Sequence, residues 1–354
     1  MISDRIHRAR KGAGLSLREL SDRVDVSHAM IKKYEDGITY PSSDILIKIA
    51  KALNVRTEYF FRPEITPKLG EIKYRLHSAI PKKELSIINQ KIDEHIERRI
   101  ELETLFPKAS KKVNLKIRNL PEKIKKLVEI EKIAEKVRGV WKLGLDPILD
   151  LVDIFEMNGI RVFSINTLDH PKFDGLSTQR LSKPFIVISN NWPGDRQRFT
   201  LAHELGHFIL EERLHSSLNE EEACNRFAAA FLFPVDSVVN IFGDNRNSIE
   251  LKELSLIKEE YGVSMGCILH RLRELEIINE YYFSQTQKLF KNKGWNITEP
   301  GNAYPREKTH VFEQMVYHAL AEDCIGESKA AELLSYNIRE FRRIRKMEPT
   351  FSLA

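Results

Sequence analysis

The apolar positions of the first 62 residues recur at the three- and four-residue spacing of short amphipathic helices. Residues 16–24 are predicted as a helix with a capping box, because Ser16 is followed three positions later by Glu19. A second helix is predicted over residues 27–34, after a short turn. Two short helices joined by a tight turn form a helix-turn-helix, whose second helix enters the major groove of DNA. The pattern therefore predicts an all-α DNA-binding module.

A narrow apolar stripe runs along the next predicted helix, over residues 82–105. Its members lie four residues apart among charged side chains and are Ile88, Ile92, Ile96 and Ile100. Such a stripe needs an apolar partner. Packing in the core of the same chain is the commoner solution, and pairing of two protomers in a homodimer is the alternative.

Two β-branched runs follow, over residues 159–165 and 184–188, and both have the length and composition of strands. The second run stands shortly before another helical pattern, so we expect one edge of this strand to face a cleft. An extended peptide can add to such an edge through main-chain hydrogen bonds. These runs predict an α+β domain in the middle of the chain.

The last part of the chain, residues 280–354, is predicted as mostly helical and carries no motif with recognisable chemistry. A basic cluster lies near its end and consists of Arg339, Arg342, Arg343, Arg345 and Lys346. A solvated charge run is the default interpretation of such a cluster, and contact with DNA or an acidic partner is the alternative.

The helical pattern after the second strand carries His203, Glu204 and His207 in the arrangement H-E-x-x-H. Residues i and i+4 lie one above the other on a helix face, so both imidazoles can bind one metal ion. Glu204 can act on a water at that ion as the general base. The motif favours zinc, and we expect one Zn²⁺ per chain. A surface coincidence of common helix residues is the alternative interpretation.

A catalytic zinc site needs a third protein ligand, and an acidic cluster opens the next predicted helix. Glu221 is the preferred candidate, because Asn225 lies one turn further on and could support one of the histidines through a hydrogen bond. Glu222 is the rival ligand, and Glu220 is a weaker one. The alternative is that the cluster only suits a helix N-terminus.

Composition narrows the class of protein. The 354 residues suffice for two or three domains, and an apolar fraction of 42% is ample for buried cores. The net charge of +5 is mild, although a local basic surface is compatible with it. Three distant cysteines argue for a reducing compartment rather than a disulfide framework. Because neither a signal peptide nor a run of membrane-spanning length is found, we expect a cytoplasmic protein without a membrane partner.

The zinc motif lies within a longer similarity to a known family. Residues 196–207, followed by Glu221, Asn225 and a stretch that ends at Pro234, resemble the ImmA/IrrE family of zinc metallopeptidases. The resemblance covers about residues 125–275. It includes the family's entry helix, first strand, following turn and edge strand, which correspond to residues 141–148, 158–163, 173–177 and 184–188.

This resemblance implies a zincin-like α+β fold and a role for each residue of the motif. Glu204 would be the general base, and the zinc ligands would be His203, His207 and Glu221. The chain departs from the family at Ala223, where many members have Glu. The glutamate four positions before Asn225 is kept, so the resemblance favours Glu221 over Glu222 as the third ligand.

The first 65 residues resemble the lambda-repressor-like (XRE) helix-turn-helix family. The signature positions are Gly14-Leu15-Ser16, Val26-Ser27, Ile31, Tyr34-Glu35-Asp36-Gly37 and Pro41-Ser42. By that resemblance the residues that face DNA are Ser27, His28, Ala29, Lys32 and Lys33. The chain departs from many relatives at Leu17, where a glutamine would contact the phosphate backbone. The resemblance implies a double-stranded DNA operator as partner, and a docking domain that has lost DNA binding is the alternative.

Together these patterns predict a multidomain chain with an all-α helix-turn-helix domain, an α+β zincin-like metallopeptidase domain and a mostly helical C-terminal region. The expected segments are a DNA-binding domain, a helical connector, a peptidase domain and a C-terminal region over residues 1–65, 66–124, 125–275 and 276–354. The expected function is that of a DNA-binding transcriptional regulator with a zinc-dependent endopeptidase. It would cleave a repressor, an antitoxin or another regulatory protein through a zinc-activated water.

The alternative is a helix-turn-helix repressor or antitoxin whose metal site is structural, sensory or inactive. A structural zinc site is closed by a fourth protein ligand, whereas a catalytic one keeps a water. His215 and Cys224 are the nearby candidates for a fourth ligand, and neither has persuasive spacing. The candidates for stabilising an oxyanion are Tyr261, His270 and Arg271, and each is more typical of a structural role.

Overall fold

The computed structural model describes residues 2–61, 81–107, 113, 115, 117, 120–166, 173–180 and 182–348. These described residues divide into two compact units. The first unit contains residues 2–61, 81–107 and 310–348, and the second contains the described residues from 113 to 309. The chain therefore leaves the first unit, builds the second, and returns to the first. Much of the predicted connector, including residues 66–80, lies outside the described residues.

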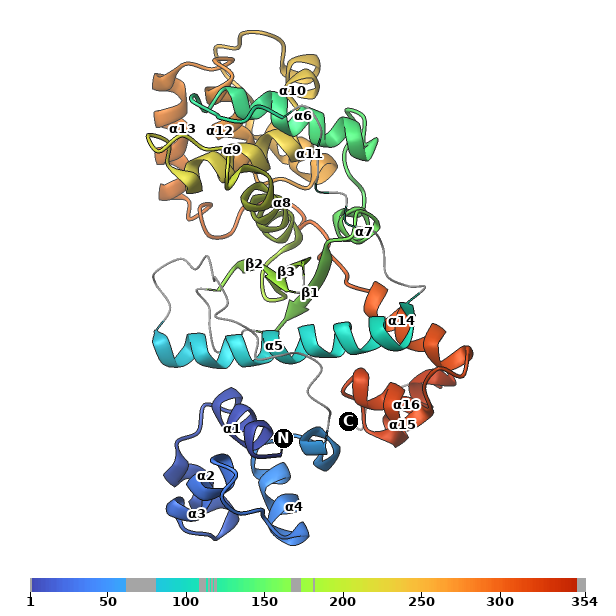
Figure 1. Cartoon of the computed structure of the whole chain (residues 1–354). Coiled ribbons are helices and arrows are strands. Elements are labelled where there is room, and N and C mark those ends of the chain that lie inside the picture. Colours follow the sequence, from blue (N-terminus) through green and yellow to red (C-terminus); the bar gives the residue numbers. More distant parts are fainter. Residues whose placement is uncertain are drawn as a thin grey trace. The chain divides into compact units, whose positions relative to one another are not determined.

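The first unit opens with a helical domain. Its elements are α1 (Ile2–Gly12), α2 (Leu17–Val24), α3 (His28–Glu35), α4 (Ser43–Ala52) and a 3-10 helix, η1 (Thr57–Phe61), all visible in Figure 1. The predicted capping box is present, because Ser16 Oγ accepts from the Glu19 amide and the Glu19 carboxylate accepts from the Ser16 amide. Asp25, with φ 57°, ends α2, and Ser27 caps α3. The predicted helix-turn-helix is therefore formed.

Helix α5 (Lys82–Leu105) connects this domain with three helices near the C-terminus, α14 (Val311–Ala321), α15 (Glu327–Leu333) and α16 (Ile338–Arg345). Arg5 and Arg8 of α1 both pair with Glu97 of α5, each at 2.5 Å. Near the other end of α5, Leu102 packs into the apolar core of the C-terminal helices, and Arg98 donates to the Leu333 carbonyl at 3.0 Å. The isoleucine stripe of α5 is at most 3% exposed, as expected for packing within the chain.

The second unit contains a small mixed sheet. Its strands are β1 (Arg161–Ile165), β2 (Gly175–Arg180) and β3 (Lys183–Ser189). The order is β1-β3-β2, in which β1 runs parallel and β2 antiparallel to β3. The prediction that residues 184–188 form an edge strand is therefore wrong, because β3 is paired on both sides. Its continuous apolar run suits a central strand with both faces buried, and the sheet's edges are β1 and β2.

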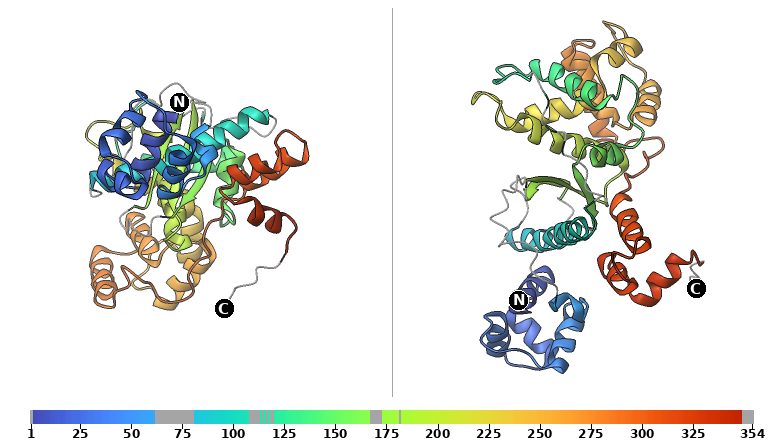
Figure 2. Two further views of the ribbon diagram at one scale, coloured as in Figure 1. Left: turned by 90° about the horizontal axis from the view of Figure 1, so that it is seen from below. Right: turned by 45° about the vertical axis from the view of Figure 1, so that its right-hand side comes forward.

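Helices make up the rest of the second unit. They are α6 (Glu129–Trp141), α7 (Leu151–Met157), α8 (Gly194–Leu210), α9 (Glu220–Leu232), α10 (Val235–Phe242), α11 (Leu251–Tyr261), α12 (Met265–Glu274) and α13 (Glu280–Asn292). Helix α8 contacts β2 and β3 on one side and α9 on the other, and α9 in turn packs on α6. The right-hand view in Figure 2 shows the α-helices of this unit gathered mainly on one side of the sheet. The motif-bearing helix therefore lies between the sheet and the helical layer.

The fold class is the one expected from the sequence: a helical domain with a helix-turn-helix, an α+β region and a mostly helical C-terminal region. None of the described helices is both long and apolar enough to cross a membrane.

Candidate metal centre

Helix α8, which carries the H-E-x-x-H motif, is fixed along its length by buried contacts. Arg198 is 0% exposed, donates to the Ile148 carbonyl at 2.6 Å and pairs with Glu307 at 2.7 Å. At the start of α8 the chain near Pro305 crosses so closely that a Cβ on Gly194 would lie 1.9 Å from the Pro305 carbonyl oxygen. The glycine is therefore required there, and these contacts set the position of the motif.

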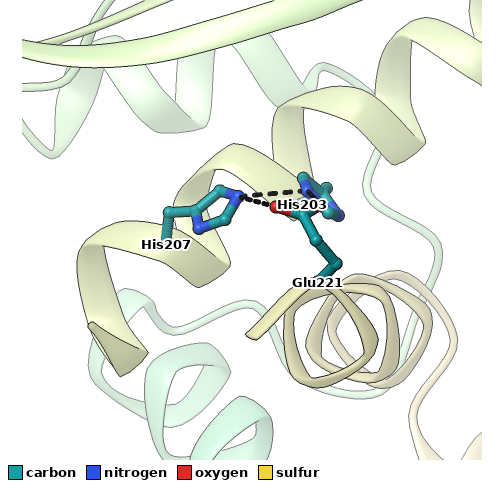
Figure 3. A group of neighbouring side chains, drawn as sticks. All are labelled: His203, His207 and Glu221. Atoms are coloured by element: carbon teal, nitrogen blue, oxygen red, sulfur yellow. Dashed lines mark hydrogen bonds and ion pairs between the residues drawn. The ribbon is translucent and has the colours of Figure 1, made fainter. Parts of the chain in front are cut away.

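The two histidines of the motif point their Nε2 nitrogens at one another. These nitrogens lie 3.2 Å apart, as the i, i+4 spacing on one helix face predicts. His203 is 7% exposed and His207 is 2% exposed. Figure 3 shows the two rings turned toward the side chain of Glu221. Two imidazole nitrogens that share one small space are suited to a single bound ion.

Glu221 reaches this space from the first turn of α9. Asn219 caps that helix by accepting a hydrogen bond from the Glu222 amide at 2.9 Å, which starts the helix just before Glu221. Helix α9 can approach α8 closely because position 206 is Gly; a Cβ there would lie 3.2 Å from the Cys224 Cα. The close crossing of the two helices brings the Glu221 carboxylate to the histidines.

The three side chains have the separations that a tetrahedral ion requires. Oxygens of Glu221 lie 3.3 Å from His203 Nε2 and 3.7 Å from His207 Nε2. Ligands at the zinc–nitrogen and zinc–oxygen distances of proteins are about 3.3 Å apart in a tetrahedron. Within the described residues, His203, His207 and Glu221 form the one group of three or more His, Cys, Asp or Glu side chains with metal-binding geometry. The residues present thus fit a zinc ion.

The far side of each imidazole is also occupied. His203 Nδ1–H donates to Asn225 Oδ1 at 2.9 Å, and His207 Nδ1–H donates to Glu220 Oε1 at 2.9 Å. A proton held on Nδ1 leaves the lone pair on Nε2, which is the form that binds a metal. The sequence suggested Asn225 for such a role but ranked Glu220 only as a weak ligand. The spacing along α9 puts Glu220 beside His207, and no local sequence signal indicates that contact.

The rival ligands do not join the group. Glu222 lies on the exposed side of α9, and His215 is exposed with its Nδ1 bonded to Ser217 at 2.8 Å. Cys224 Sγ lies 3.4 Å from His207 Nδ1, the ring nitrogen that faces away from the group. Within the described residues the centre has three protein ligand atoms, and the Glu221 side chain is 48% exposed. A site of this kind leaves a position for water, as catalytic zinc sites do.

Glu204 follows His203 directly on α8 and is only 4% exposed. The three oxyanion candidates have structural contacts instead. Tyr261 packs its ring 4.3 Å from that of Phe233, and His270 bonds Gln287 at 2.8 Å. Arg271 is 1% exposed and makes a two-pronged ion pair with Glu131 at 2.5 and 2.6 Å, which joins α12 to α6.

The predicted DNA-facing residues all lie on α3 or at its cap, and all are exposed: Ser27, His28, Ala29, Lys32 and Lys33. The opposite side of α3 contributes Ile31 to the core of the domain. Lys32 pairs with Asp36 at 2.7 Å on the surface, a contact weak enough for a phosphate to replace. The exposed side of α3 is thus available to a groove of DNA.

The structure thus combines a helix-turn-helix domain with an α+β region in which two histidines and a glutamate could hold a metal ion. Comparison with known families gives the same division. Residues 6–60 match the helix-turn-helix family, and residues 155–273 match a peptidase family described as the IrrE N-terminal-like domain. The chain therefore carries an XRE-type helix-turn-helix domain followed by an IrrE N-terminal-like domain.

Curated relatives are similar to this chain over short stretches. HTH-type transcriptional regulators of Rickettsia prowazekii and Rickettsia conorii are each 38% identical over 60 residues, which is 17% of this chain and 46% and 48% of theirs. One of Mycobacterium tuberculosis is 39% identical over 56 residues, or 16% of this chain and 40% of its own. The chain thus spans less than half the length of these relatives.

Proposed function

We propose that this chain is a DNA-binding transcriptional regulator that carries a zinc-dependent endopeptidase. The observation that carries the proposal is the convergence of His203 Nε2, His207 Nε2 and the Glu221 carboxylate within an IrrE N-terminal-like domain. The helix-turn-helix match and the exposed side of α3 support an operator in double-stranded DNA. The four segments predicted from the sequence remain our proposed domain boundaries.

The residues of the centre divide the chemistry among them. A zinc ion held by the three ligands supplies Lewis acidity and lowers the pKa of a water toward neutrality. Asn225 and Glu220 hold the two imidazoles in the orientation and tautomer that leave Nε2 free to ligate. The Glu204 carboxylate takes a proton from the attacking water and passes it to the leaving amine. The reaction is hydrolysis of a peptide bond.

The proposed substrate is a regulatory protein: a repressor, an antitoxin or the chain itself. The reason is that a DNA-binding domain and a peptidase domain on one chain suit a regulator whose cleavage reaction changes the occupancy of its operator. Such a protein would act in the cytoplasm, where it can reach its operator. It would bind one zinc ion per chain and have no membrane partner.

The decisive experiment measures metal content and cleavage together. Protein purified without added metal should contain about one zinc per chain by mass spectrometry of the metal, and His203→Ala should lose it. N-terminal proteomics should then find new protein termini in cells that express the wild type and not in cells that express His203→Ala. Zinc without any new terminus would favour the alternative, a regulator whose metal site is sensory or inactive. Absence of zinc even after titration would overturn the proposal.

A further inference from the structure

The three C-terminal helices α14, α15 and α16 form a small domain that neither the metal centre nor the first helix-turn-helix uses. They enclose an apolar core in which Val316, Ala319, Ala330 and Phe341 are all 0% exposed. The ring of Tyr317 stacks on that of Phe341 at 5.9 Å, which fixes α16 against α14. This core, to which Leu102 of α5 also contributes, holds the surface of α16 in a defined orientation.

The turn between α15 and α16 repeats the turn between α2 and α3. In each, a residue in the left-handed conformation ends the first helix, the next amide donates to the carbonyl five positions back, and the following side chain caps the second helix. These three residues are Asp25, Val26 and Ser27 in the first turn, and Ser335, Tyr336 and Asn337 in the second.

The backbone angles and hydrogen-bond distances of the two turns are similar. The left-handed φ angles are 57° at Asp25 and 62° at Ser335. The amide-to-carbonyl bonds that close the turns are 3.3 Å from Val26 and 2.9 Å from Tyr336. Each cap side chain accepts from the amide three positions on, at 3.2 Å for Ser27 and 2.8 Å for Asn337. The turn between α15 and α16 thus has the same backbone geometry as the turn of the first helix-turn-helix.

The buried positions repeat as well. The fourth residue after each cap, Ile31 in α3 and Phe341 in α16, is 0% exposed and anchors the second helix in its core. In the first helix of each pair, Leu20 and Ala330 stand at the same distance before the turn, and both are 0% exposed. The same side of each second helix therefore faces inward.

The outward side of α16 carries more positive charge than that of α3. Its eight residues, Ile-Arg-Glu-Phe-Arg-Arg-Ile-Arg, include four arginines and one glutamate. Arg339 and Arg342 occupy the positions that Ala29 and Lys32 hold in α3, and both are exposed. Arg342 and Arg345 pair with Glu327 on the surface, at 2.9 and 2.5 Å. Exposed pairs of this kind contribute little, so a phosphate can take either arginine.

We propose that α14–α16 form a second helix-turn-helix and that α16 binds double-stranded DNA through its exposed arginines. The inference goes beyond the proposed function, in which α3 alone contacts DNA. The turn geometry favours DNA over an acidic protein, because it presents the second helix as the first domain presents α3. Arginine suits this role, since its planar fork binds phosphates and the edge of guanine with two hydrogen bonds.

The test uses the full chain and a fluorescein-labelled mixed-sequence duplex of about three helical turns, with binding followed by anisotropy between 0.05 and 0.3 M salt. The α16 variant changes Arg339, Arg342 and Arg345 to Gln. The salt slope is the slope of the logarithm of the binding constant against the logarithm of the salt concentration. Each phosphate contact makes this slope steeper by about 0.9 and raises the affinity about fivefold near 0.15 M salt. We expect the variant to bind about 10- to 100-fold more weakly, with a slope lower by about 2 to 3.

The matched control removes the same charge elsewhere, by changing the exposed Lys132, Lys252 and Lys288 to Gln, and should bind like the wild type. A variant of α3, Lys32→Gln with Lys33→Gln, distinguishes the contributions of the two domains to DNA binding. The DNA binding that this variant retains should disappear when its substitutions are combined with those of the α16 variant. If the α16 variant binds DNA with the affinity and salt slope of the wild type, the proposal is overturned. This is also the result expected if α16 binds an acidic protein instead of DNA.

A second measurement keeps the result clear if the α16 variant fails to fold. Phenylglyoxal modifies exposed arginines, and mass spectrometry reads the modification of Arg339 and Arg342 in the wild-type chain. DNA should protect these two arginines severalfold but leave Arg246, in the second unit, unprotected. Equal modification of Arg339 with and without the duplex would overturn the proposal.

Discussion

The two histidines of the candidate metal centre are buried and held in place by other side chains, whereas the side of α3 that we propose faces DNA consists of exposed side chains. His203 and His207 are 7% and 2% exposed, and each has a partner for its Nδ1 nitrogen. On α3 the corresponding surface residues extend from a helix whose other side, at Ile31, is buried. The side chains of the metal centre are therefore positioned before an ion binds, whereas the exposed side chains of α3 complete their contacts only with a partner.

This difference decides how each region responds to change. A ligand set that converges on one ion fails as a whole, because removing one member leaves the others without the geometry that binds the ion. Exposed lysines on α3 act through charge, nearly independently, and their effect falls as salt rises. Substitutions in the metal centre should therefore have large effects on metal binding or cleavage, and substitutions on α3 should have small, salt-dependent effects on DNA binding.

The largest effect is expected from Glu204→Gln. The variant keeps the shape of a buried side chain but cannot take a proton, and general acid–base catalysis contributes about 100- to 10,000-fold. Cleavage of the substrate identified by proteomics should fall by that factor, while zinc content and DNA affinity stay at wild-type values. Glu212→Gln, an exposed carboxylate just after α8, is the control and should cleave normally. If Glu204→Gln still cuts its substrate, our assignment of the general base is wrong.

A smaller effect is expected from Asn225→Ala. Losing the acceptor for His203 Nδ1–H frees the imidazole to rotate, and such changes weaken metal binding about 10- to 100-fold. Competition with a chromophoric chelator measures this affinity. Asn225→Asp keeps an oxygen acceptor and should retain most of it, and Asn292→Ala, at an exposed position of α13, should have no effect. An unchanged affinity in Asn225→Ala would mean that the hydrogen bond does not position the ligand.

The features that the sequence predicted correctly are those encoded within a few residues. The capping box at Ser16 and Glu19 and the one-face placement of His203 and His207 depend on spacings of three or four positions. Local backbone geometry fixes such relations, whatever the rest of the chain does. The same holds for the turn at Asp25.

Features that join distant segments were not predictable in the same way. Residues 184–188 were expected at a sheet edge, but β3 is central because β2, which was predicted only as a turn, pairs with it. The ion pair of Arg198 with Glu307 joins residues 109 positions apart in the sequence. No periodicity marks Glu307 as the partner of a buried arginine. Such contacts follow from packing, which a single sequence records only indirectly.

The smallest effect, on stability, is expected beneath the exposed side of α3, at Glu35. Burial raises the pKa of this carboxyl, but hydrogen bonds from Arg10 and His7 outweigh it and lower the pKa to about 2 from its ordinary 4.5. Because the folded pKa is depressed, the stabilisation is complete above pH 4.5 and is lost as pH falls toward 2. Glu35→Gln should therefore destabilise the first helical domain at pH 7 by about 1 to 3 kcal/mol.

The measurement is a urea titration read by pulsed hydrogen exchange of residues 2–35, at pH 7 and at pH 3. Tryptophan fluorescence serves as an internal reference, because Trp141, Trp192 and Trp295 all lie in the second unit. The difference between wild type and Glu35→Gln should shrink at pH 3, and Asp22→Asn, an exposed carboxylate on α2, should match the wild type at both. A constant difference at the two pH values would show that the Glu35 charge is not what stabilises the domain. The comparison would then change, because α3 would be held by packing alone, whereas hydrogen bonds hold the histidines of α8.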